Sequence, residues 1–159
     1  MPDTPQIAFG GGCHWCTEAV FQVVPGVLDV RQGWCSGLDA PARFSEGVVV
    51  EYDARAVSLP QLVAVHLHTH ACTSDHALRR KYRSAVYGFS ESDIDVARAA
   101  IAELQSEFER PIVTEVVRMG GFRQNRERYL DYYRKNPEAP FCERYIGPKL
   151  AALRARFGW

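Results

Sequence analysis

The segment that most constrains the fold is a short apolar run followed by three glycines and a cysteine. Ile7, Ala8 and Phe9 form the apolar run, and Gly10-Gly-Gly leads to Cys13. This pattern predicts a strand, a glycine turn and a helix that begins at the cysteine. Unpaired backbone N–H groups and the positive end of the helix dipole meet at such a helix start. That environment lowers the pKa of a thiol and favours a reactive thiolate.

A second cysteine, Cys16, lies one helical turn beyond Cys13. The pair alone is compatible with a semi-buried structural pair, a zinc half-site or a redox thiol pair. Zinc would need further ligands from Cys35, Cys72 or the histidines at 66, 68 and 70. An extended segment would align those histidines, but the apolar pattern before them favours a helix, in which only residues 66 and 70 share a face.

Composition narrows the class of protein. The 159 residues are 47% hydrophobic and 24% charged, which is typical of a globular chain, and one domain over 1–159 is expected. Nineteen basic residues balance nineteen acidic ones, so neither nucleic acid nor a membrane surface is favoured as partner. There is no membrane-spanning run and no signal-like N-terminus, so the sequence predicts a cytoplasmic protein with reduced thiols. Five cysteines argue against a purely structural disulfide framework.

Periodicity predicts an alternation of short strands and helices with two long connections. The alternating segments predict strands, and segments with apolar residues at helical spacing predict helices. Strands are expected at 7–9, 27–34, 48–53, 82–89 and 114–118, helices at 17–24, 58–70, 90–108, 125–135 and 148–157, and irregular segments at 33–45 and 71–81. This order is typical of an α+β domain with two layers.

Several motifs in order resemble one known family. Gly11-Gly-Cys-His-Trp-Cys-Thr-Glu-Ala-Val-Phe is similar to the motif of type A peptide methionine sulfoxide reductases, whose hallmark is Gly-Cys-Phe-Trp. Glu46 before a valine-rich strand, Tyr82-Arg-Ser-Ala-Val-Tyr, and the C-terminal stretch around Cys142 continue the match over nearly the whole chain. The resemblance implies a two-layer sandwich with a mixed, mostly antiparallel sheet and a ferredoxin-like core.

The resemblance also implies roles for particular side chains. Cys13 would be the nucleophile that attacks the sulfoxide sulfur, while a protonated Glu46 in an apolar pocket gives its proton to the oxygen. Tyr82 would bind the sulfoxide oxygen through its hydroxyl. Trp15 would form an apolar wall for the methyl group of the substrate.

Recycling of the thiol follows from the same resemblance. Attack leaves a sulfenic acid on Cys13, which a second thiol converts to a disulfide. Cys16 is the nearest candidate for this resolving role, and Cys142 is the second. Thioredoxin or a similar external dithiol would then reduce the disulfide, with no bound cofactor and no metal. We expect a monomer that acts on oxidised proteins or on free methionine sulfoxide, with preference for the S epimer.

The chain departs from the family pattern around the expected substrate. His14 replaces the family's phenylalanine, Trp34 stands where a Gly-Tyr pair is usual, and Phe44 cannot supply a missing hydroxyl. Asp75 is only a nearby substitute for the family's aspartate. Three alternatives therefore remain open: a reductase of another sulfoxide, a dithiol exchange protein and a zinc-binding module.

Overall fold

The glycine turn joins the first strand to the first helix, as the sequence predicts. In the computed structural model, which describes residues 4–74 and 82–159, strand β1 (Gln6–Gly10) is almost wholly buried and α1 (His14–Gln22) follows directly. Gly11 has a φ of +146°, and an added Cβ would lie 2.6 Å from the His70 ring, so only glycine fits there. Gly12 has no atom within 4 Å of the position of an added Cβ.

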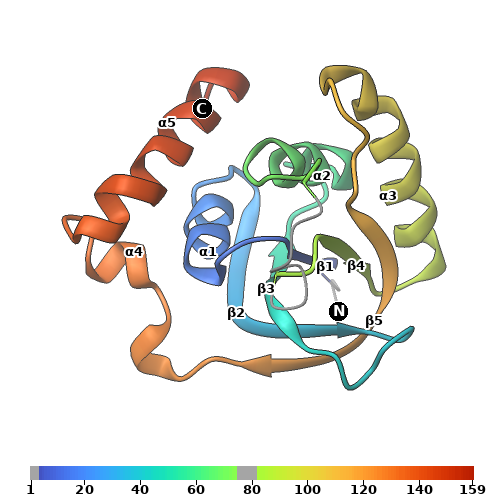
Figure 1. Ribbon diagram of the computed structural model, residues 1–159, viewed down its shortest axis with the longest axis horizontal. Coiled ribbons are helices and arrows are strands. Elements are labelled where there is room, and N and C mark those ends of the chain that lie inside the picture. The colour runs from blue at the N-terminus through green and yellow to red at the C-terminus, as the bar shows by residue number, and fades with distance from the viewer. Residues whose placement is uncertain (1–3, 75–81) are drawn as a thin grey trace.

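Five strands form one closed sheet (Figure 1). After β1 come β2 (Val27–Gly37), β3 (Ser45–Tyr52), β4 (Ala85–Gly88) and β5 (Glu115–Gln124). The spatial order is β1-β3-β2-β5-β4, and β4 also pairs with β1, which closes the ring. Among the described strands all pairings are antiparallel except β4 with β5. The prediction of an α+β fold with a mixed sheet is therefore confirmed.

The structure does not confirm the two-layer sandwich or the ferredoxin-like core, because the sheet closes into a barrel. Closure depends on residues that the sequence placed in a loop. Strand β2 continues to Gly37, and β5 continues to Gln124, so that Gly33 pairs with Gln124 and Ser36 with Gly121. Glycines permit this contact, since an added Cβ at Gly33 would lie 1.9 Å from the carbonyl oxygen of Arg123.

Three longer helices agree with the sequence prediction, and the last of them packs on α1 and on the turn before it rather than on the strands. Helix α2 (Leu59–His68) is capped by Ser58, and α3 (Glu91–Leu104) by Ser90, whose hydroxyls accept backbone N–H bonds from the first turn. The 3₁₀ turn η2 (Gln105–Glu107) extends α3, and α5 (Gly147–Phe157) ends the chain. Figure 1 shows α3 on one side of the barrel and α5 on the other. Within the described residues no helix combines the length and apolar character that crossing a bilayer requires.

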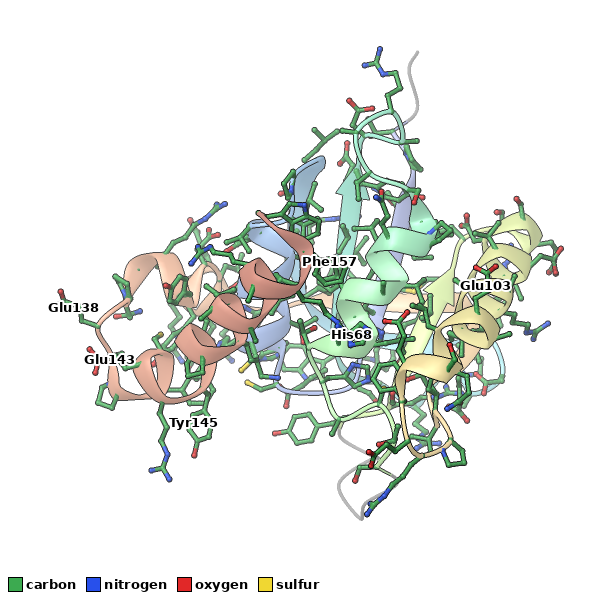
Figure 2. The ribbon with its side chains drawn as sticks, turned by 90° about the horizontal axis from the view of Figure 1, so that it is seen from above. His68, Glu103, Glu138, Glu143, Tyr145 and Phe157 are labelled. Atoms are coloured by element: carbon green, nitrogen blue, oxygen red, sulfur yellow. The ribbon has the colours of Figure 1, made fainter. Side chains whose placement is uncertain are left out.

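The C-terminal segment, residues 125–159, is less regular than predicted. The single helix expected at 125–135 is wrong: the 3₁₀ turn η3 (Glu127–Tyr129) and the one-turn helix α4 (Tyr132–Lys135) are separated at Asp131, whose φ is 54°. A π-helical turn, η4 (Cys142–Ile146), then leads into α5. The exposed side chain of Tyr145 lies on the outer side of this segment in Figure 2.

Candidate active site

Cys13 occupies the N-cap position of α1, and its carbonyl accepts the backbone N–H groups of Cys16 and Thr17 at 3.1 Å each. The pKa of the Cys13 thiol is lowered to about 7. The largest cause is a hydrogen bond from the Cys16 thiol, and the backbone N–H of Trp15 adds to it. Burial and the negative charge of Glu46 act in the opposite direction. The Cys13 thiol therefore ionises closer to neutral pH than an ordinary cysteine does.

Cys16 is held as the neutral thiol. Its pKa is raised, first because its proton is donated to Cys13 and then because it is buried. Lys149 opposes this shift, while the buried Cys142 adds to it, so both groups act electrostatically on Cys16. Cys13 and Cys16 line one cavity of about 190 Å³, which residues of the C-terminal segment, among them Phe141, complete on its far side.

Cys142 sits in the π-helical turn η4 and is fully buried. Burial raises the pKa of its thiol. All five cysteines are in the thiol form, and Cys35 and Cys72 are buried in the core. Cys16 is therefore the second thiol that shares the Cys13 cavity.

Glu46 reaches the start of α1 from strand β3 and is only 6% exposed. Its Oε1 accepts the backbone N–H of His14 at 3.3 Å and lies 3.4 Å from Nδ1 of the His14 ring. That ring nitrogen is also 3.3 Å from the carbonyl oxygen of Gly33. Trp34 pairs with Glu46 across the sheet and meets the His14 ring edge-on at 5.3 Å. The structure thus brings together Glu46, His14 and Trp34 beside the N-cap cysteine.

Trp15 lies next to His14, with ring centroids 6.3 Å apart, and forms an aromatic cluster with the C-terminal segment. Its ring stacks on Tyr132 at 4.1 Å with an interplanar angle of 8°, and meets Phe141 edge-on at 5.6 Å. Sequence reasoning gave neither Tyr132 nor Phe141 a role in the site. Their only signal was that both lie in C-terminal motifs that match the family pattern. The predicted wall at Trp15 is therefore built from residues more than a hundred positions apart.

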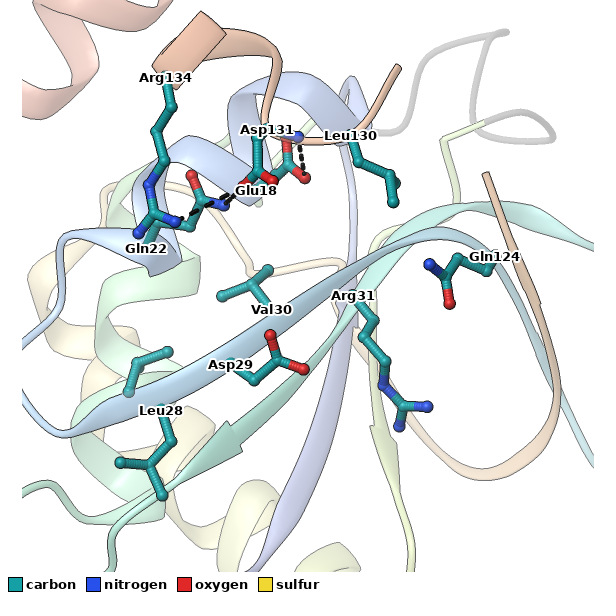
Figure 3. Close-up of a pocket in the computed structure, with 11 residues that line it drawn as sticks. Glu18, Gln22, Leu28, Asp29, Val30, Arg31, Gln124, Leu130, Asp131 and Arg134 are labelled. Carbon is teal, nitrogen blue, oxygen red and sulfur yellow. Dashed lines mark hydrogen bonds and ion pairs between the residues drawn. The ribbon is translucent and has the colours of Figure 1, made fainter. Parts of the chain in front are cut away.

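Glu18 holds this cluster in place, and sequence reasoning missed it too. The carboxylate is 2% exposed and accepts the backbone N–H groups of Asp131 at 2.9 Å and Tyr132 at 3.2 Å. Burial raises its pKa. Figure 3 shows Glu18 beside Asp131, which also accepts a 2.6 Å bond from Gln22 and pairs with Arg134 at 3.6 Å. Helix α1 is thereby fastened to the segment that carries Tyr132.

One predicted site residue lies within residues 75–81, which the structure does not describe, and another follows directly after them. Asp75 falls outside the described residues. Tyr82 is half-buried just before β4, and the next residue, Arg83, is buried and pairs with Asp39 at 2.6 Å and Glu115 at 2.5 Å. These ion pairs raise the pKa of Arg83 and fix the backbone that follows Tyr82.

Comparison with known proteins identifies the family of this chain. A sequence model described as "Peptide methionine sulfoxide reductase" matches residues 5–158. The chain belongs to this family. The chain is 35% identical to the protein named peptide methionine sulfoxide reductase MsrA of Trichodesmium erythraeum, over 99% of this chain and 97% of that one. The MsrA of Ralstonia nicotianae is 36% identical over 93% and 88% of the two chains.

Solved structures of similar proteins share the fold. Methionine sulfoxide reductase A of Corynebacterium diphtheriae superposes with a TM-score of 0.75 at 24% identity, over 86% of this chain and 77% of that one. Mxr1 of Saccharomyces cerevisiae in its reduced form gives 0.79 at 21% identity, over 89% and 91%. The α+β architecture is therefore that of methionine sulfoxide reductase A structures.

In this family member the histidines near the C-terminal end of α2 brace the glycine turn. His66 donates from Nε2 to the carbonyl of Gly10 at 2.7 Å and stacks on His70 at 4.1 Å. His70 in turn contacts the Ser84 hydroxyl at 2.8 Å, whereas His68 faces Glu107. The helical interpretation of this run is confirmed through His68, and His70 lies in the turn that follows α2. Across residues 4–74 and 82–159 no group of histidine, cysteine and acidic side chains is arranged to hold a metal ion.

Asn125 is a further neighbour that the sequence did not reveal. Its Nδ2 lies 3.4 Å from Nε2 of His14 and donates to Oε1 of Gln32 at 2.6 Å. Asn125 follows directly after β5, so its position depends on the extension of that strand. No local pattern marks it.

Proposed function

We propose that this protein reduces methionine sulfoxide to methionine with Cys13 as the nucleophile. The observation that carries the proposal is the pairing of a low-pKa N-cap thiol with a buried carboxyl group, Glu46, in a chain of this family. Curated relatives that match almost the whole chain are named peptide methionine sulfoxide reductase.

The chemical step needs a nucleophile and a proton. The Cys13 thiolate attacks the substrate sulfur, and Glu46 gives a proton to the sulfoxide oxygen, which cannot depart as an oxide dianion. The sulfur–oxygen bond and the new bond between the two sulfurs both break as the protonated oxygen passes to Cys13, which leaves a sulfenic acid on Cys13 and releases methionine. Tyr82 is proposed to bind the oxygen, while His14, Trp15 and Trp34 surround the methyl group.

Cys16 is proposed as the resolving thiol. While Cys13 is a thiolate, the hydrogen bond between them keeps Cys16 protonated and unreactive. Conversion of Cys13 to a sulfenic acid removes that negative charge, so Cys16 can ionise. Its sulfur then attacks Cys13, water leaves and a disulfide forms. Cys142 is the second candidate, but it would first have to leave the core.

An external dithiol would supply the two electrons that restore the thiols, so no bound cofactor is required. Thioredoxin is the proposed reductant, and yeast Mxr1, a structural neighbour, has been solved in complex with Trx2. A monomer acting in the cytoplasm completes the proposal, since a reducing compartment keeps the cysteines reduced between turnovers.

A coupled thioredoxin assay tests this function directly. Both epimers of methionine sulfoxide would be supplied, free and within a peptide. The consumption of the NADPH that keeps thioredoxin reduced would be measured. We expect turnover of the S epimer and none with Cys13→Ser. Turnover of an unrelated sulfoxide with none of methionine sulfoxide would contradict the substrate, and absence of any sulfoxide turnover would contradict the reaction.

A further inference from the structure

A second cavity opens beside the candidate active site, at the end of strand β5. It has a volume of about 590 Å³. Three aromatic residues, Trp34, Phe44 and Tyr129, and two arginines, Arg123 and Arg126, line it. We refer to it as the β5 cavity. Aromatic walls with a few charged groups are typical of sites that bind small molecules or single side chains.

The β5 cavity is joined to the reacting groups through His14. Trp34, one wall of the cavity, meets the His14 ring at 5.3 Å, and Asn125, which also lines it, lies 3.4 Å from Nε2 of that ring. The other ring nitrogen is 3.4 Å from Glu46. One imidazole ring therefore separates the cavity from the proposed acid. A substrate bound at Glu46 can place a neighbouring group in the cavity.

The charge of the β5 cavity is positive. Arg123 and Arg126 are both exposed, and within the described residues neither forms an ion pair. The Arg123 guanidinium lies over the Phe44 ring at 4.3 Å, which fixes its plane without neutralising its charge. A guanidinium held in this way is suited to bind a carboxylate through two parallel hydrogen bonds.

We propose that the β5 cavity binds a carboxylate carried by the sulfoxide substrate, and this rests on the proposed function. In a peptide the carboxylate would be an acidic side chain next to the oxidised methionine. In a small substrate it would be the α-carboxylate of methionine sulfoxide itself. The cavity thereby gives the enzyme a preference for acidic over basic sequence surroundings.

Matched peptides test the preference. Three capped peptides would carry methionine sulfoxide next to Glu, Gln or Lys, and kcat/KM would be measured for each. We expect the Glu peptide to exceed the Lys peptide by about fivefold at low ionic strength, since exposed charge pairs contribute modestly. The ratio should fall as salt is added. The kcat/KM values of N-acetyl methionine sulfoxide and its carboxamide would also be compared. This pair tests whether the α-carboxylate of a small substrate, rather than an acidic side chain of a peptide, binds in the cavity.

Variants locate the effect. In the double variant Arg123→Gln, Arg126→Gln the Glu-to-Lys ratio should approach one, whereas Arg98→Gln, which alters an exposed arginine of α3 outside the cavity, should leave it unchanged. Equal rates for all peptides in the unaltered protein, or a ratio that survives the double variant, would overturn the proposal.

A binding measurement separates this inference from the proposed function. With Cys13→Ser, dissociation constants for the Glu and Lys peptides can be read from tryptophan fluorescence without turnover. If the protein reduces no peptide but still binds the Glu peptide more tightly, the proposed function fails and the carboxylate site stands. Equal dissociation constants would overturn the site even if reduction occurs.

Discussion

Two regions of the molecule are held in place by different interactions. One is the barrel together with α1, and the other is the C-terminal segment. In the barrel, backbone hydrogen bonds between closed strands fix the positions of Glu46 and of the turn before Cys13. Among the described residues, the C-terminal segment contributes no strand to the sheet. It buries apolar side chains such as Ile146 and Leu150 in the core, and side-chain hydrogen bonds add to this, from the backbone of Asp131 and Tyr132 to Glu18 and from Lys149 to the carbonyl of Thr69. The proposed nucleophile and acid thus lie on α1 and the barrel, whereas Tyr132, Phe141 and Cys142 lie on the C-terminal segment.

The largest effect should come from Cys13, the proposed nucleophile at the start of α1. Cys13→Ser is expected to lower sulfoxide turnover by more than about a thousandfold, because a hydroxyl at this position is not ionised near neutral pH. Methionine formed per enzyme in a single turnover measures the loss. Cys35→Ala, which alters a buried core thiol, serves as control, and measurable turnover by Cys13→Ser would disprove the assignment.

The acid on β3 should come next. Glu46→Gln is expected to slow the chemical step by about a hundredfold or more, since the amide cannot give a proton to the oxygen. Stopped-flow measurement of methionine formation isolates that step. Glu51→Gln on the same strand is the control, and an unchanged chemical step with slower recycling would place the acid elsewhere.

The link between the two thiols predicts a pH effect. In the unaltered protein the alkylation rate of Cys13 should rise with pH through about 7, as the thiolate forms. In Cys16→Ala the largest cause of the lowered pKa is gone, so the midpoint should move to higher pH. Cys16→Ser keeps a hydroxyl donor and should fall between the two. An identical midpoint in all three proteins would show that Cys16 does not stabilise the thiolate.

Removal of the hydrogen bonds between Glu18 and the C-terminal segment should lower the stability of the protein. Glu18→Ala leaves two backbone N–H groups without their acceptor, so the free energy of unfolding should fall by about 2 kcal/mol. Amide hydrogen exchange at residues 131–141 should rise more than in the barrel strands. Glu103→Ala on the exposed surface of α3 is the matched control. Uniform exchange throughout the protein would contradict the contrast between the two regions.

The smallest effect should come from restoring the family's residue at position 14. His14→Phe keeps the backbone N–H that binds Glu46, so kcat/KM for methionine sulfoxide should change by less than about tenfold. Steady-state kinetics measure this. A loss as large as that of Glu46→Gln would mean that the ring takes part in the proton transfer.

The sequence predicted the elements whose signals are local. Ser58 and Ser90 mark the starts of α2 and α3, and apolar periodicity marks their buried faces. The extension of β2 and β5 could not be predicted in this way, because Gly37 and Gly121 are typical of loops until a partner strand approaches them. Closure of the barrel depends on that contact between distant residues, so it has no local signal.

The site shows the same limit. The order of motifs along the chain brought Cys13, Glu46 and Tyr82 forward as candidates, because each belongs to a short stretch with its own pattern. Asn125 belongs to no such stretch, and Glu18 lies within the Cys13 motif without a pattern of its own. Their contacts arise only where α1 meets the C-terminal segment and where β5 ends. A buried carboxylate that binds backbone N–H groups looks like any other glutamate in the sequence.

The open space at Gly12 has a consequence for how Cys13 is reached. An added Cβ there would have no atom within 4 Å outside its chain neighbours, and Gly12 itself, unlike Gly11, does not have a positive φ. Glycine at position 12 therefore leaves open space next to the Cys13 sulfur. Gly12 and Cys13 line the same cavity, so a larger side chain at position 12 would narrow the space beside the sulfur.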